Sequence, residues 1–117
     1  MNSSSATAVA EPATEPDTEQ AQTRPKRQPL YSVILHNDHL NTMEFVVSVL
    51  CKVFRINSTS AKRLMMEAHR SGRAIVWTGV LEVAELKRDQ IRSCGADPVM
   101  KMLGASPLRV TIEPISD

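Results

Sequence analysis

The fold is decided by residues 30–54, which have the sequence LYSVILHNDHLNTMEFVVSVLCKVF. Tyr31, Val33 and Leu35 fall on one face of an extended chain, and this alternation predicts a strand over 30–36. Helical spacing replaces the alternation from about Thr42 to Phe54, which predicts an amphipathic helix. The apolar positions that recur at that spacing are Met43, Val46, Val47, Leu50 and Phe54.

Downstream, the same change of period occurs again. A second helix is predicted over 58–71, with apolar residues on one side and Gly72 placed to form a left-handed cap. A short strand follows over 73–77, and a third helix covers roughly 81–93.

The last part of the chain completes the fold. Asp97, Pro98 and Gly104 have the order of N-cap, first turn and C-cap, so a short helical turn is expected between them. The final stretch, PLRVTIE at 107–113, alternates as a half-buried strand does. The order β-α-α-β-α-β predicts a single small α+β domain, with a three-stranded antiparallel sheet and three helices on one face.

Composition divides the chain into two parts. Residues 1–29 have hardly any aliphatic side chain larger than Val9. Such a segment cannot bury enough surface to offset the entropy of ordering, so a disordered arm is predicted there and one domain over 30–117.

The net charge of +1 and the scattered aromatic residues argue against nucleic-acid binding. The longest apolar runs, of about five residues, are far shorter than the ~20 that a membrane span needs.

Two further features bear on the compartment. The N-terminus lacks the basic and long apolar regions of a secretory signal, so a cytoplasmic location is expected. Cys51 and Cys94 lie far apart with no partner motif, and two buried free thiols are predicted.

Five polar side chains crowd between the first strand and the first helix. They are His36, Asn37, Asp38, His39 and Asn41. Burying them costs free energy unless something pairs with them. Helix capping explains part of the cluster, because Asn41 and Glu44 have the spacing of a capping box. A metal site that adds His69 is a second explanation, but no Cys-x-x-Cys or His-x-x-x-His pattern supports it, and no metal is predicted.

The third interpretation is a binding pocket. His69 lies four residues after Met65, so both project from the same side of the second helix. Met43 and Val46 are likewise one turn apart on the first helix. If the two helices pack together, these side chains enclose an apolar cavity with the polar segment 37–38 near its mouth. Such a cavity suits a hydrophobic body with a cationic head, as in a peptide N-terminus with a large first side chain.

Four stretches of the sequence resemble the ClpS family. They are YSVILHNDHLNTMEFVVSVLCKVF, AKRLMMEAHRSGRAIV, LEVAELKRDQI and PLRVTIE, and the resemblance covers roughly residues 29–113. These proteins are small adaptors that hand proteins with destabilising N-terminal residues to the bacterial Clp protease. The resemblance implies a monomeric adaptor without enzymatic activity or cofactor, which binds proteins that begin with Phe, Leu, Trp or Tyr.

The resemblance also implies roles for particular residues. The positions that bind the substrate's α-amino group are Asn37, Asp38 and His69, joined by His39 where the family usually has a second Asp. The positions that line the side-chain pocket are Met43, Val46, Met65, Ala68 and Leu108, with Met43 as the gatekeeper against branched side chains. Glu82 and Lys87 contact the N-terminal domain of the Clp AAA+ unfoldase, and the arm takes part in delivery.

Other positions depart from the family's pattern. Ala68 replaces a larger aliphatic residue, which should deepen the pocket and favour tryptophan. Trp77-Thr78-Gly79-Val80 alters the region before the third helix, and the segment 97–104 is longer than usual. Two alternatives stay open: a regulator that docks on the unfoldase without binding N-termini, and a protein-interaction module of the ribosomal stalk type.

Overall fold

β1 (Leu30–His36) is the central strand of a three-stranded antiparallel sheet with the order β2-β1-β3. The computed structural model describes residues 28–116, and β1 pairs there with β2 (Arg73–Val80) and β3 (Val110–Pro114). The predicted arm lies outside the described residues except for its last two positions.

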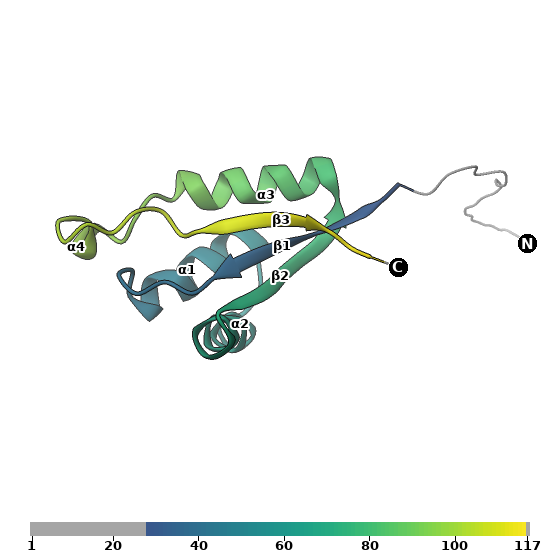
Figure 1. Cartoon of the computed structure of the whole chain (residues 1–117). Coiled ribbons are helices and arrows are strands. Elements are labelled where there is room, and N and C mark those ends of the chain that lie inside the picture. The colour runs from purple at the N-terminus through teal and green to yellow at the C-terminus, as the bar shows by residue number, and fades with distance from the viewer. Residues whose placement is uncertain (1–27, 117) are drawn as a thin grey trace, which may run out of the picture.

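Three helices cover one face of this sheet (Figure 1). They are α1 (Met43–Phe54), α2 (Ser58–Ser71) and α3 (Leu81–Ser93), and the short α4 (Pro98–Lys101) follows them. α1 contacts both α2 and α3, and α3 contacts all three strands. Val33 and Leu35 of β1 lie in one buried core with Leu50 of α1 and Ile91 of α3. The α+β fold and the element order predicted from the sequence are confirmed.

β2 is longer than the strand predicted over 73–77. Its pairing with β1 continues to Val80, after a register shift of one residue near Val76. The Trp77 ring covers Gly79 so closely that a Cβ at Gly79 would overlap the ring carbons. α3 begins directly after β2. Residues 77–80, which precede the third helix, are therefore part of a strand and not of a loop.

The start of α1 differs from the predicted capping box. The N-cap is Thr42, whose Oγ1 accepts the N–H of Phe45 at 3.1 Å. The capping box of Asn41 with Glu44 is therefore wrong, and the side chain of Asn41 is buried in a tertiary contact. At the end of α2, the left-handed cap predicted at Gly72 is confirmed by its φ of 92°.

Three smaller expectations have mixed outcomes. The helical turn predicted between Asp97 and Gly104 is α4, capped by Asp97 as expected. Cys51 and Cys94 are free thiols as predicted, but each is half-buried rather than buried. Within residues 28–116, no helix combines the length and the apolar character needed to cross a membrane.

Candidate functional site

The side chain of Asp38 organises the loop between β1 and α1. Asp38 Oδ1 accepts the N–H groups of Leu40 and Asn41 at 2.8 Å each, and Oδ2 accepts Asn41 Nδ2–H at 2.7 Å. Asn37 Oδ1 accepts the N–H of Asp38 at 2.9 Å. An ionised carboxylate offers about four acceptor positions, so Asp38 keeps one for a ligand. The Asn37 amide oxygen likewise keeps its second lone pair.

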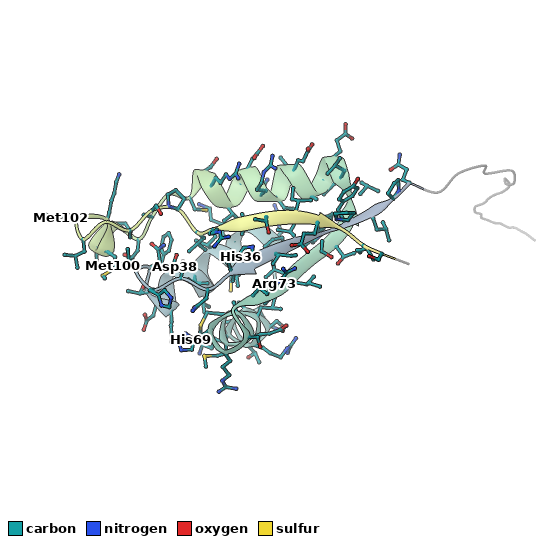
Figure 2. All side chains as sticks on the ribbon, viewed as in Figure 1. His36, Asp38, His69, Arg73, Met100 and Met102 are labelled. Carbon is teal, nitrogen blue, oxygen red and sulfur yellow. The ribbon has the colours of Figure 1, made fainter. Side chains whose placement is uncertain are left out.

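Asn37 also joins this loop to the end of α2. Its N–H donates to the carbonyl oxygen of Gly72 at 2.9 Å. His69 is exposed in the last turn of α2, three residues before that glycine. Figure 2 shows Asp38 and His69 at the same end of the molecule, one on the loop and the other on α2.

A cavity of about 480 Å³ opens between this loop, α1 and α2. Eight of the nine residues expected to bind a substrate line it. They are Asn37, Asp38, His39, Met43, Val46, Met65, Ala68 and His69. The ninth, Leu108, is not part of the lining, because it is buried in the hydrophobic core. The structure thus gathers in one place the residues that the sequence spread over two helices and a loop.

The cavity has an apolar wall and a partly apolar mouth. Val46, Met65 and Ala68 are buried, whereas Met43 is 46% exposed and can be reached from solvent. Leu35 and Leu40 also line the cavity and were missed from the sequence. Leu35 had a usable signal, because it belongs to the apolar face of β1, which packs against the helices.

His36 is a further lining residue that was not expected in a pocket. Its Nε2 is hydrogen-bonded to Thr111 Oγ1 at 2.7 Å, which ties the end of β1 to β3. Burial lowers the pKa of His36, and the nearby cations Arg109 and Arg73 lower it further. The part of the chain from 28 to 116 contains no group of three or more His, Cys, Asp or Glu side chains placed to hold a metal ion.

Two more cavity residues, Asn41 and Thr42, hold the segment that contains α4. Asn41 Oδ1 accepts the N–H of Asp97 at 2.8 Å, and Asn41 Nδ2 donates to the Ser106 carbonyl oxygen at 2.8 Å. Thr42 Oγ1 donates to Asp97 Oδ2 at 2.6 Å. This hydrogen bond is the main cause that lowers the pKa of the Asp97 carboxyl. These contacts link distant parts of the chain, so no local sequence pattern indicates them.

Glu82 and Lys87 lie on α3 but border different hollows of the surface. Glu82 is exposed beside the start of β1, next to Pro29 and Tyr31. Lys87 is half-buried, and its Nζ donates to the carbonyl oxygen of Val53 in the last turn of α1 at 3.1 Å. Lys87 therefore has a structural contact of its own.

Comparison with known proteins identifies the family. The model of the family described as "ATP-dependent Clp protease adaptor protein ClpS" matches residues 26–111. The chain belongs to the ClpS family. It is 37% identical over 89 residues to the Clp protease adapter ClpS of Myxococcus xanthus, covering 76% of this chain and 78% of that protein. With ClpS of Ruegeria pomeroyi it shares 47% identity over 68 residues, which cover 56% and 60% of the two chains.

A solved ClpS structure has the same fold. The structure of Agrobacterium tumefaciens ClpS2 bound to L-phenylalaninamide superposes with a TM-score of 0.66 at 39% identity, covering 76% of this chain and 100% of that one. The chain is therefore an adaptor of a Clp protease, and ClpS is a family of adaptors rather than of proteases. The ribosomal-stalk alternative is set aside by this match.

Proposed function

We propose that this ClpS protein captures polypeptides by a free N-terminal Phe, Leu, Trp or Tyr and delivers them to the N-terminal domain of a Clp unfoldase. One observation carries the proposal. A single cavity combines a buried apolar wall with oxygen and nitrogen acceptors beside its mouth. The wall suits the first side chain of a substrate, and the acceptors suit its ammonium group.

The acceptors match the ammonium group in number. An α-ammonium offers three N–H donors, and Asp38, Asn37 Oδ1 and a ring nitrogen of His69 are the candidate acceptors. His39 lines the same cavity in place of a second carboxylate. Replacing a charge-assisted hydrogen bond costs about 1.5–3 kcal/mol, so amine binding is weaker here than with an Asp at that position but is retained.

The ligand of the Agrobacterium relative supports this chemistry. L-phenylalaninamide has a free amino group and an aromatic side chain, and its blocked carboxyl group resembles a continuing peptide. We infer the same class of ligand here. Docking of α3 on the unfoldase through Glu82 and Lys87 would then raise the local concentration of captured cargo, because two sites are joined on one scaffold.

The test is a titration of fluorescent peptides by anisotropy. A peptide that begins with free Phe should bind, whereas the same peptide with an acetylated N-terminus should not, because acetylation removes the charge and two of the three donors. A third peptide that begins with Ser controls for the side-chain pocket. Equal binding of the free and acetylated peptides would refute capture of the amine. Binding of the unfoldase without binding of any peptide would instead favour a regulator that does not bind N-termini.

A further inference from the structure

The segment 97–104, called here the α4 segment, presents apolar side chains to solvent. Val99 is 75% exposed, Leu103 is 68% exposed and Met102 is 92% exposed. Figure 2 shows Met102 at the tip of the molecule, with Met100 between it and Asp38 in that view. Exposed apolar side chains that gather on one element are typical of an interaction site.

The α4 segment is braced by hydrogen bonds. The N–H of Lys101 donates to the Asp97 carbonyl oxygen at 2.8 Å, and the N–H of Gly104 donates to that of Lys101 at 3.0 Å. Ala105 is buried and its N–H donates to the Met100 carbonyl oxygen at 3.2 Å. The apolar side chains therefore project from a hydrogen-bonded backbone.

This segment continues the surface of the cavity. Asn41 and Thr42 line the cavity and also hold Asp97, the first residue of the segment. Leu40 and Met43, which flank Asn41 and Thr42 in the sequence, also line the cavity and are 42% and 46% exposed. An extended chain advances about 3.3–3.6 Å per residue, so three residues that leave the cavity span roughly 10 Å. That length is enough for a bound chain to extend beyond the lining residues Asn41 and Thr42, which hold the α4 segment.

We propose that the α4 segment binds the residues that follow the N-terminal residue of a substrate and favours apolar side chains at positions two to four. This inference rests on the function proposed above. Methionine side chains are flexible and adapt to different partners, which suits a surface that meets many substrate sequences. The preference is therefore for apolar character rather than for one particular side chain.

The size of this surface argues against a second copy of the chain as its occupant. A stable interface between two copies buries about 800 Å² on each partner, more than the three exposed side chains of the α4 segment supply.

The experiment compares three ligands by calorimetry on the full chain. L-phenylalaninamide tests the cavity alone, and two free-amine peptides that begin Phe-Leu-Met and Phe-Ser-Gly test the extension. We expect the apolar peptide to bind about five- to tenfold more tightly than the polar one. The double variant Met102→Ser/Leu103→Ser should lose this preference and keep its affinity for L-phenylalaninamide. The control Ile75→Ser/Leu86→Ser, at exposed apolar positions on β2 and α3, should keep both.

Two binding results would overturn the inference while leaving the proposed function intact. One is equal affinity of the unchanged protein for the two peptides, and the other is a preference that survives in the double variant. Failure of all three ligands to bind would refute the proposed function itself. Sedimentation velocity adds a last comparison: self-association that the double variant abolishes would assign the α4 segment to a second copy and overturn the inference.

Discussion

The Thr42 hydroxyl donates a 2.6 Å hydrogen bond to Asp97 Oδ2, although the two residues are 55 positions apart in the sequence. The same hydroxyl oxygen accepts the N–H of Phe45 and so caps α1. Asp97 in turn accepts the N–H of Val99 and caps α4. One pair of side chains therefore fixes the starts of two helices and joins the cavity to the α4 segment.

Replacing Asp97 by Asn should lower the melting temperature by several degrees at neutral pH, because the charged acceptor of Thr42 is lost. The pKa of Asp97 is lowered in the folded protein, chiefly by that hydrogen bond. Its contribution to stability is therefore complete above the ordinary Asp pKa of about 3.9 and is lost as the pH falls through the lower folded value. Urea unfolding at pH 7 and pH 3 should show the gap between the two proteins narrowing in acid. The exposed Asp89→Asn on α3 is the control.

Gly79→Ala should destabilise the protein by about 1–3 kcal/mol, because the added methyl group overlaps the Trp77 ring. Gly79 does not have a positive φ, so the ring and not backbone strain is the cause. In a background of Trp77→Leu the same substitution should cost much less. Urea denaturation of the two single variants and the double variant gives this coupling as a double-mutant cycle. Equal costs in both backgrounds would contradict the contact.

Periodicity predicted the elements well because the buried faces follow the helical and strand repeats. It failed where a long-range contact decides the outcome. Asn41 and Thr42 are both favourable N-cap residues. The choice between them depends on Asp97, whose backbone N–H donates to the Asn41 amide oxygen. The length of β2 was underestimated for a similar reason, since pairing with β1 carries Gly79 into the sheet.

The candidate site was predictable to the extent that it depends on helical spacing. Met65 and His69 are one turn apart on α2, so their common direction follows from the sequence alone. The tertiary partners of Asn41 and the place of Leu108 in the core depend on how segments far apart in the sequence pack. Neither has a local signal.

Protonation of His36 should destabilise the folded protein. Its pKa is lowered, first by burial and then by Arg109 and Arg73, so the unfolded chain binds a proton more readily than the folded one. Stability should therefore be full above the ordinary His pKa of about 6.5 and decline as the pH falls through the lower folded value. His36→Gln should flatten the pH dependence of urea unfolding between pH 7 and pH 5. Parallel curves for His36→Gln and the unchanged protein would refute this.

Ala68→Leu should shrink the cavity, because Ala68 is buried in its wall and the larger side chain projects into the space. We expect affinity for peptides that begin with Trp to fall about tenfold or more, and affinity for those that begin with Leu to fall less. Calorimetry with the two peptides measures the change. Thr59→Leu, at an exposed position of the same helix, provides the matched control. An unchanged affinity for the Trp peptide would show that the first side chain binds elsewhere.

Lys87→Met should reduce stability by about 0.5–1.5 kcal/mol, because the Val53 carbonyl oxygen at the end of α1 loses its donor. Glu82→Gln should change stability by less than about 0.5 kcal/mol, because Glu82 is exposed. Binding of each variant to the isolated N-terminal domain of a Clp unfoldase, measured by calorimetry, then separates docking from folding. If α3 is the docking surface, Glu82→Gln weakens binding without a loss of stability. The other outcome is that only Lys87→Met weakens binding, whereas Lys87→Arg keeps both stability and binding. In that case Lys87 acts by holding α3 against α1 rather than by touching the unfoldase.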